Sequence, residues 1–356
     1  MTERYQVHPS IEALYQQPSS DLVQCLLPDT PVFLRPGWFE IYERYAGQQG
    51  DTRVLSCKTS AGMQYAFFKQ MERDYGLFSI RHLNSMSNYY SPMFDVFCVG
   101  DIRADYSQLV RESLTWFKKF DTITLFPLTI QQADAWRVAF DEAGFSSHIY
   151  DFSVNWFHDD IADTDSFWAS RSSRLKNTIK RKRRKMEKAG DFSFLVTDCS
   201  DNDIEKLLAD YHQVYNSSWK HSEASPDFID HLCRYQYEKG ELRIGIAYHQ
   251  SKPIAAQLWF VNGKTAYIYK LAYDEDYSKF SAGTVLSAEL FNYVIAQDKV
   301  AKIDFLTGAD NYKQDWMSAS QKLYGLQVSN SLRPAGLVYT LYNQLSAFKK
   351  SISSRG

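Results

Sequence analysis

Residues 278–316 combine a helix start made of small residues with a short strand that holds a single carboxylate. Ser281, Ala282, Gly283 and Thr284 precede an apolar helical stripe, and Lys279 lies just upstream. A helix N-terminus exposes N–H groups and the positive end of the helix dipole, and small residues let an anion approach the backbone. Taken alone, these residues favour an ordinary capped helix. The three strand-like runs before them make the arrangement more specific and favour a phosphate site.

Asp304 is the second chemical candidate in this segment. In the strand-like run KIDFLTG, Ile303 and Phe305 point to one face and Asp304 to the other. If both faces of the sheet are covered, burial would raise the pKa of this carboxyl group, as a general base requires. The alternative is a carboxylate that caps a loop or pairs with a nearby Lys or Arg. The alternation fits both interpretations equally.

The composition is that of a globular protein without strong charge. The 356 residues exceed the size of most single cores, so two domains are expected; 44% are hydrophobic and 23% are charged. A net charge of −2 gives no general attraction to nucleic acid or acidic membranes. No apolar run approaches the ~20 residues of a membrane span, and the first residues lack the pattern of a secretory signal. Five cysteines without a CxxC pair and eight histidines without ligand spacing argue against a metal site. We expect a cytoplasmic protein without a metal.

Periodicity predicts a mixed α/β (α+β) chain. Both halves contain strand, loop, helix and strand in the same order. This order indicates an internal duplication whose two copies have diverged in sequence, with a boundary near residues 159–164. The expected strands are 53–57, 64–69, 76–81, 95–99, 122–126, 148–157, 192–196, 242–249, 253–261 and 266–273, and the expected helices are 106–120, 130–143, 163–189, 201–217 and 227–239.

Several runs resemble the GNAT N-acyltransferase superfamily, in the CelD/BcsL-like branch related to the Fem/Mur aminoacyl-ligases. The runs that carry the resemblance are RSSRLKNTIKRKRRKMEKAGDFSFLV, GELRIGIAYHQSKPIAAQLWFV, YIYKLAYDEDYSKFSAGTVL and KIDFLTGADNYKQDW, with FLRPGWFEIYERY and SMSNYYSP in the first half. The resemblance covers residues 165–320 best. It implies two tandem GNAT-like domains, each a mixed twisted sheet flanked by helices. They are residues 1–160, degenerate and without CoA, and residues 161–356, with an acyl-CoA site.

The resemblance also implies where the parts of the cofactor lie. The strand before the phosphate loop would splay from its neighbour and admit the pantetheine arm along Tyr269, Leu271 and Tyr273. The pyrophosphate would bind the loop formed by Lys279, Ser281, Ala282, Gly283 and Thr284. This loop departs from the usual pattern, because only one glycine remains and Arg and Gln are missing. In the first half, the equivalent run DYSQLVRES has no glycine and begins with an acidic residue, so no CoA is expected there.

An N-acyltransferase must deprotonate its amine acceptor, stabilise an oxyanion and protonate the leaving sulfur. Asp304, singled out by the strand alternation, would serve as the base. By the resemblance, Lys313 would offset charge on the acyl carbonyl, while Tyr312 and Trp316 shape the pocket. The alternative for YKQDW is an aromatic-anchored surface turn. No Cys or Ser stands in a recognisable nucleophile setting, which favours direct attack in a ternary complex.

The most charged run, KRKRRKMEK, is either the solvated face of a helix or a guide for an anionic partner. Arg181 in this run and Arg174, earlier in the same expected helix, are the candidates for substrate binding. Fem/Mur relatives use aminoacyl-tRNA and carry a long helical hairpin; here one basic helix has no long partner, so acyl-CoA is favoured and tRNA is the alternative.

The expected reaction is transfer of an acetyl or larger acyl group from CoA to an amine. The family suggests an amino sugar or another precursor of surface polysaccharide as acceptor. Tyr90, Trp219 and His221 are expected to line the acceptor cleft, with core packing as the alternative for the aromatic residues. The rivals are an aminoacyl-tRNA-dependent ligase and a catalytically silent GNAT-like binding protein.

Overall fold

The computed structural model describes residues 4–16, 30–46, 50–74, 79–99, 103–310 and 312–338. The chain forms two compact units: unit 1 contains Met1–Ser153 and Lys322–Gly356, and unit 2 contains Val154–Gln321. The boundary expected near residue 160 thus lies earlier, and the chain returns to unit 1 instead of ending in unit 2. The reason is β13 (Ala319–Ser329), which pairs with β6 (Thr122–Leu128) from Tyr324 onward.

Unit 1 is built on an antiparallel run of β1 (Tyr5–His8), β2 (Asp51–Lys58), β3 (Met63–Asp74) and β4 (Ser79–Ser85). Next to β4 lies β6, which is parallel to it, and β13 is antiparallel to β6. The remaining elements are β5 (Phe97–Cys98), which pairs with β3, and α1 (Ile11–Tyr15), η2 (Val32–Leu34), α2 (Pro36–Tyr45), α3 (Tyr106–Glu112), α4 (Leu114–Phe117) and α5 (Ile130–Glu142).

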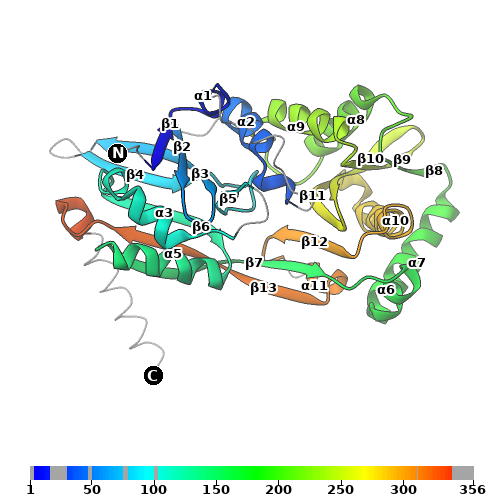
Figure 1. Ribbon diagram of the computed structural model, residues 1–356. Coiled ribbons are helices and arrows are strands. Elements are labelled where there is room, and N and C mark those ends of the chain that lie inside the picture. Colours follow the sequence, from blue (N-terminus) through cyan, green and yellow to red (C-terminus); the bar gives the residue numbers. More distant parts are fainter. Residues whose placement is uncertain are drawn as a thin grey trace. The chain divides into compact units, whose positions relative to one another are not determined.

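Unit 2 repeats this order with other strands (Figure 1). The antiparallel run is β8 (Phe192–Thr197), β9 (Leu242–His249), β10 (Lys252–Asn262) and β11 (Thr265–Tyr273). Its parallel neighbour is β12 (Lys302–Thr307), and β7 (Ser146–His158) is antiparallel to β12 from Asn155 onward. The helices are α6 (Thr164–Ser170), α7 (Ser173–Ala189), α8 (Ile204–Asn216), α9 (Pro226–Glu238), η3 (Glu275–Phe280), α10 (Ala282–Ala296) and α11 (Lys313–Trp316).

The two units therefore share one topology, as the repeated pattern in the sequence predicts. Each has four antiparallel strands, a fifth strand parallel to the fourth, and a sixth strand antiparallel to the fifth. A parallel neighbour requires a helical crossover, which α3 and α4 provide in unit 1 and α10 provides in unit 2. The α/β fold class with a mixed sheet in each unit is confirmed.

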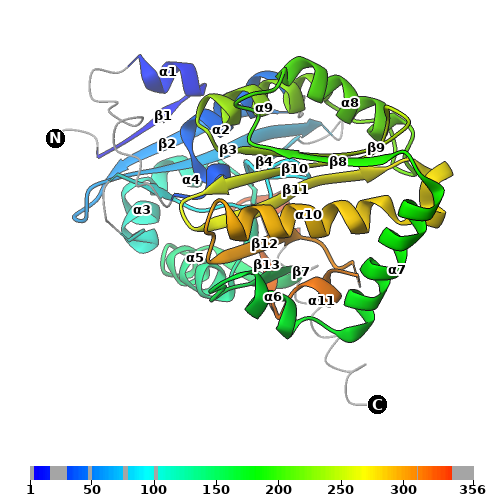
Figure 2. The ribbon, with the colours of Figure 1, turned by 90° about the vertical axis from the view of Figure 1, so that its right-hand side faces the viewer.

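Helices cover both faces of the unit 2 sheet (Figure 2). On one face α8 and α9 pack against β9, β10 and β11; on the other lies α10, which α6 and α7 cover from outside. Gly245 on β9 allows α10 to come close, because a Cβ there would lie 2.6 Å from Leu290 Cδ1 and 3.2 Å from Leu286 Cδ1. The sheet and α10 are therefore in direct contact over the middle of the helix.

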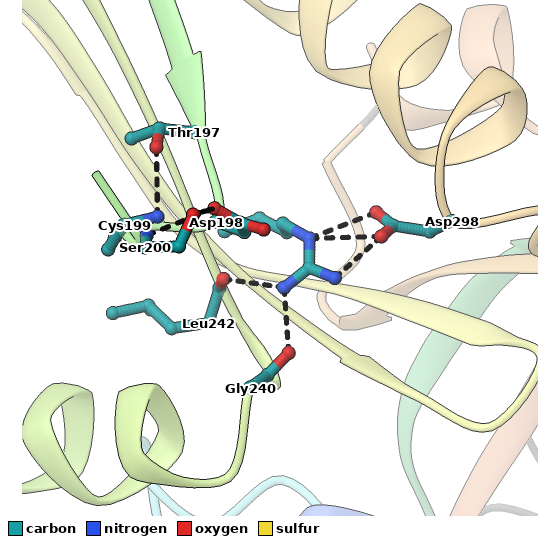
Figure 3. A network of polar contacts seen from close by, with 8 residues as sticks. Thr197, Asp198, Cys199, Ser200, Gly240, Leu242 and Asp298 are labelled. Carbon is teal, nitrogen blue, oxygen red and sulfur yellow. Dashed lines mark hydrogen bonds and ion pairs between the residues drawn. The ribbon is translucent and has the colours of Figure 1, made fainter. Parts of the chain in front are cut away.

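An ion pair attaches the far end of α10 to the sheet (Figure 3). The guanidinium group of Arg243 donates to both carboxylate oxygens of Asp298, with Nη2 to Oδ1 at 2.5 Å and Nε to Oδ2 at 3.0 Å. Its Nη1 donates to the carbonyl oxygens of Gly240 and Leu242 at 2.9 and 2.8 Å. Both charged side chains are about nine-tenths buried. This network connects the start of β9 to the loop that follows α10.

The helix expected over residues 163–189 is two helices, because Arg171 between them has an extended backbone. Ser172 caps the second helix by accepting a hydrogen bond from Leu175 N at 3.2 Å. The guanidinium group of Arg171 is buried and donates to Trp316 O and Ser318 Oγ. These contacts hold the kink between α6 and α7 against α11.

Candidate active site

The cavity of unit 2 lies where β12 turns away from β11. β10 pairs with β11 as far as Tyr273, whereas β12 pairs only with the first three residues of β11, ending at Tyr267 opposite Asp304. Leu306 has a left-handed backbone (φ 56°), and the register between β12 and β7 shifts there. This kink carries β12 away. A cavity of about 410 Å³ adjoins the unpaired part of β11, lined by Arg174, Leu175, Thr178, Trp219, Gln257, Leu271, Ala272, Tyr273, Ser278, Ser281, Gly283, Thr284, Ser287, Tyr312, Asp315 and Trp316.

The first turn of α10 is anchored to the sheet by Gln257, a fully buried residue of β10. Its Nε2 donates to Gly283 O at 3.0 Å and to Ser287 Oγ at 2.8 Å. Ser287 Oγ also donates to Gly283 O at 2.9 Å, and Gln257 Oε1 accepts from Trp259 Nε1 at 2.9 Å. The position of the helix start relative to β10 is thus held by side-chain hydrogen bonds.

The helix start itself has the features of an anion site. Ser281 has a left-handed backbone, and its carbonyl oxygen accepts from Thr284 N at 3.0 Å and Val285 N at 3.2 Å. The N–H groups of Ala282 and Gly283 have no acceptor within the helix, as at every helix start. A Cβ on Gly283 would be 3.6 Å from the nearest Tyr273 atom, an ordinary contact, so the fold itself does not require a glycine here.

Three groups of side chains form the remaining walls. The Tyr273 and Trp219 rings lie 4.5 Å apart, which makes an aromatic wall beside β11. α7 contributes Arg174, Leu175 and Thr178, and α11 contributes Asp315 and Trp316, with Tyr312 just before it. The cavity therefore combines an apolar wall with a polar helix start, which suits a ligand that has an apolar arm and an anionic group.

Tyr269 does not line the cavity, although the spacing of Tyr269, Leu271 and Tyr273 suggests one face. The register between β10 and β11 shifts so that Trp259 pairs with Ile268 and Leu258 with Lys270, which leaves Tyr269 as the extra residue of a β-bulge. Its ring packs on Phe260, 4.9 Å away. The bulge reverses the alternation, so that Leu271 and Tyr273 lie on the side of the sheet that carries α10.

Asp304 is buried at the point where the two strands diverge. Burial raises the pKa of its carboxyl group, against the opposing effects of Lys302 and of hydrogen bonds from Leu306 N at 2.9 Å and Asn155 Nδ2 at 3.2 Å. Asp304 shows features of both interpretations from the sequence. As a capping and paired carboxylate, it caps the kink and lies 3.5 Å from Lys302 Nζ; as a candidate base, it is buried and has a raised pKa. Asp304 is not part of the cavity lining.

Lys313 is also buried close to the divergence. Its Nζ donates to the carbonyl oxygens of Phe305 and Thr307 at 3.3 Å each and lies 3.7 Å from Asp310 Oδ2. Burial lowers the pKa of this amine. The ammonium group packs against Gly308, where a Cβ would be 2.5 Å from Nζ. Lys313 therefore holds the end of β12 and does not line the cavity.

The structure separates the other candidates. Arg174 lines the cavity, whereas Arg181, two turns further along α7, is exposed outside it. Lys279 lies at the end of η3, where its carbonyl oxygen accepts from Lys182 Nζ at 2.8 Å, and Ala282 is buried. Neither belongs to the lining.

Two further candidates also lie outside the cavity. His221 is exposed and does not line it. Tyr90 is buried in unit 1, and all lining residues come from unit 2.

Three polar residues in or near the cavity were not identified from the sequence: Gln257 and Lys270 are buried, and Lys220 is half-buried. Lys220 Nζ donates to Leu271 O at 2.6 Å, and Lys270 Nζ donates to Glu223 Oε2 at 3.1 Å. Burial lowers the pKa of both amines, that of Lys270 to about 8. Gln257 and Lys270 are single polar residues in apolar strands, which is the same signal that identified Asp304. Lys220 lies in a loop without such a pattern.

The corresponding helix start in unit 1 differs. The carboxylate of Asp105 caps α3 by accepting a hydrogen bond from Gln108 N at 2.9 Å. A negative charge already occupies the place where an anion would bind. Among the described residues, no group of His, Cys, Asp and Glu side chains is arranged to hold a metal ion, and no helix has the length and apolar character of a membrane span.

Residues 173–314 match the family model of the acetyltransferase (GNAT) domain. This part of unit 2 is therefore similar to GNAT domains. The matched segment contains every residue that lines the cavity except Asp315 and Trp316. The match supports a transferase and the GNAT superfamily. It does not extend to the CelD/BcsL-like branch, which stays a prediction.

Solved structures extend the likeness to both units but at low identity. FemX shares 10% identity over 89% of this chain and 95% of its own, with a TM-score of 0.58. The C-terminal domain of a putative lysylphosphatidylglycerol synthetase from Agrobacterium fabrum shares 11% over 90% of this chain and 94% of its own, with a TM-score of 0.54. No curated protein matches the chain. At these identities the likeness shows the fold alone.

Proposed function

We propose that the protein is an N-acyltransferase that uses acyl-CoA and that the unit 2 cavity is its cofactor site. The observation that carries the proposal is the cavity beside the unpaired part of β11, which ends at the start of α10. The N–H groups of Ala282 and Gly283 and the hydroxyls of Ser281 and Thr284 would hold the pyrophosphate. Leu271, Tyr273 and Trp219 would contact the pantetheine arm.

The proposed reaction is direct attack of an amine on the thioester. The nitrogen–carbon bond forms, the carbon–sulfur bond breaks, the amine loses a proton and the sulfur gains one. Asp304 is the proposed base, because it is buried, its pKa is raised, and it lies at the last paired position before the strands diverge. Lys313, whose ammonium group lies just beyond that point, would offset negative charge on the carbonyl. No cysteine lines the cavity, which supports a mechanism without a thiol nucleophile.

The proposed acceptor is an amine of a sugar or of another precursor of surface polysaccharide, on the family resemblance alone. The proposed location is the cytoplasm, where acyl-CoA is available.

Titration calorimetry of acetyl-CoA and desulfo-CoA into the protein tests the cofactor site. The Gly283→Asp variant adds a carboxylate where the pyrophosphate would bind, and we expect it to abolish binding. Gly283→Ala has room for its Cβ, so this variant should fold normally but bind several-fold more weakly, since the backbone can no longer be approached closely. Gln297→Glu places the same added charge at the opposite, exposed end of α10 and should bind as the wild type does.

Two results would contradict the proposal. Absence of binding to the wild type at high protein concentration would exclude acyl-CoA, and tight, salt-sensitive binding of tRNA would then favour the aminoacyl-tRNA alternative. Binding that is equal in the wild type and in folded Gly283→Asp would place the cofactor elsewhere. A silent binding protein would bind acyl-CoA but transfer nothing to any amine.

A further inference from the structure

The outer side of α7 carries a cationic stripe. α7 has nine basic residues and one acid, Glu187. Six side chains of the helix surround an open hollow of about 570 Å³, and we call them the α7 stripe: Asn177, Lys180, Arg181, Arg184, Lys185 and Lys188. Their spacing of three and four residues places them along one side of the helix.

Part of the positive charge of α7 is accounted for by contacts within unit 2. Arg183 forms an ion pair with Glu289 on α10, and Lys176 Nζ donates to Trp168 O at 3.1 Å. Lys182 Nζ donates to Lys279 O at 2.8 Å. These contacts hold α7 against α6, α10 and η3.

Four of the basic residues of the stripe have no such compensation. Within the described parts of the chain, no carboxylate lies within 4.0 Å of the charged atoms of Lys180, Arg181, Arg184 or Lys188, and all four residues are exposed. Like charges one turn apart repel each other, which weakens an isolated helix. A bound polyanion would remove this repulsion, so the stripe is suited to a multiply charged ligand.

The stripe continues directly from the cavity. Arg174 and Thr178 line the cavity, and Asn177 and Arg181 follow within one turn on the same side of α7. The stripe also includes Lys185, whose Nζ donates to the carbonyl oxygen of Lys279 at 3.4 Å. Lys279 lies two residues before Ser281, at the start of α10. The hollow therefore begins next to the start of α10.

The start of α10 contributes no cation to the cavity. The cavity-lining residues at this helix start are neutral: Ser278, Ser281, Gly283 and Thr284. Of all the residues that line the cavity, Arg174 of α7 is the one with a positive charge. Among the residues that line the cavity, positive charge for an anionic ligand thus comes from α7 rather than from the start of α10.

We propose that the α7 stripe binds the 3′-phosphate at the nucleotide end of CoA, so that α7 supplies the charge that the cavity lining at the start of α10 lacks. This inference rests on the proposed function. A phosphate monoester is close to doubly charged at neutral pH, and arginine side chains bind it through two parallel hydrogen bonds. Arg181 and Arg184 are the residues assigned to it.

The experiment compares CoA with 3′-dephospho-CoA, which keeps the pantetheine and pyrophosphate, by titration calorimetry. The wild type should bind CoA about tenfold more tightly than 3′-dephospho-CoA, as expected for a charge-assisted pair. The double variant Arg181→Gln/Arg184→Gln should bind the two compounds equally, with an affinity for 3′-dephospho-CoA close to that of the wild type. The control Lys206→Gln/Lys239→Gln removes two exposed charges from α8 and the end of α9 and should keep the tenfold preference.

The outcomes separate this inference from the proposed function. Equal binding of the two compounds by the wild type, or an unchanged preference in the folded double variant, would overturn the role of the stripe and leave the cavity as the cofactor site. Binding of neither compound would overturn the cofactor site itself. Loss of tRNA binding in the double variant, without loss of CoA discrimination, would reassign the stripe to nucleic acid.

Discussion

The ammonium group of Lys220 donates a hydrogen bond to the carbonyl oxygen of Leu271 at 2.6 Å, on the part of β11 that β12 leaves unpaired. On β12, Lys313 likewise donates to the carbonyl oxygens of Phe305 and Thr307. Two lysines with pKa values lowered by burial thus satisfy backbone acceptors on either side of the divergence. Because hydrogen bonds from side chains take the place of strand pairing there, both strands can separate without leaving these acceptors unpaired.

We expect Lys220→Met to destabilise the fold by about 1 kcal/mol, because the carbonyl group of Leu271 would lose its donor in a partly buried position. Urea unfolding measures the change. Lys206→Met, on the exposed side of α8, should change the free energy of unfolding by less than about 0.5 kcal/mol. Equal effects of the two substitutions would show that the bond to Leu271 does not stabilise the divergence.

Lys270 should make stability rise with pH in the alkaline range. Burial lowers the pKa of Lys270 from 10.5 to about 8 in the folded protein. Between these two values the unfolded chain binds more protons than the folded one, so the free energy of unfolding increases with pH, by about 3 kcal/mol over the whole interval.

The effect is isolated by subtracting the pH profile of the double variant Lys270→Met/Glu223→Gln, which removes both charges of the buried pair. Urea unfolding at a series of pH values gives both profiles. Parallel profiles would mean that Lys270 is not deprotonated in the folded protein in this range.

Asp304→Asn should lower kcat by about 10² to 10⁴ while the Kd of acetyl-CoA stays unchanged, if Asp304 is the base. The fold should be retained, since Asn can still accept the hydrogen bond from Leu306 N, and burial of a neutral group costs less than burial of a charge. Stopped-flow and steady-state rates, with calorimetry for binding, measure both quantities.

The Lys302→Met variant distinguishes a catalytic role of Asp304 from a purely structural one. Lys302 opposes the rise in the pKa of Asp304, so its removal should raise that pKa further and move the acidic limb of the pH–rate profile to higher pH. A carboxylate that only caps the kink would leave the position of this limb unchanged.

Breaking the ion pair between Arg243 and Asp298 should be costly. Asp298→Asn leaves a guanidinium group that is about nine-tenths buried without its counter-charge, and we expect a loss of about 3 kcal/mol of stability. Asp134→Asn, in the exposed pair with Arg137, should cost at most about 1 kcal/mol. Thermal and urea unfolding provide the comparison, and similar costs for the two variants would refute a structural role for the buried pair.

Local patterns in the sequence were sufficient for the elements that carry the site. The alternation of apolar residues predicted β9, β10 and β11 within two residues at each end, and the small-residue start of α10 was placed at residues 281–284. The opposite orientation of Asp304 relative to Ile303 and Phe305 singled out this residue, which is buried and has a raised pKa, but left its role as base or cap open. Such features depend on neighbours in the chain, and periodicity reports them directly.

The tertiary structure decided which of these residues meet. Tyr269 does not line the cavity because β11 has a one-residue bulge there. Whether such a bulge is stable depends on the packing between β10 and β11. The return of β13 to unit 1 and the contact of Lys220 with Leu271 join segments far apart in the chain. Periodicity tells which face of a strand is apolar, but the place where two strands diverge depends on the backbone kink at Leu306 and on the side chains that satisfy the unpaired carbonyl groups.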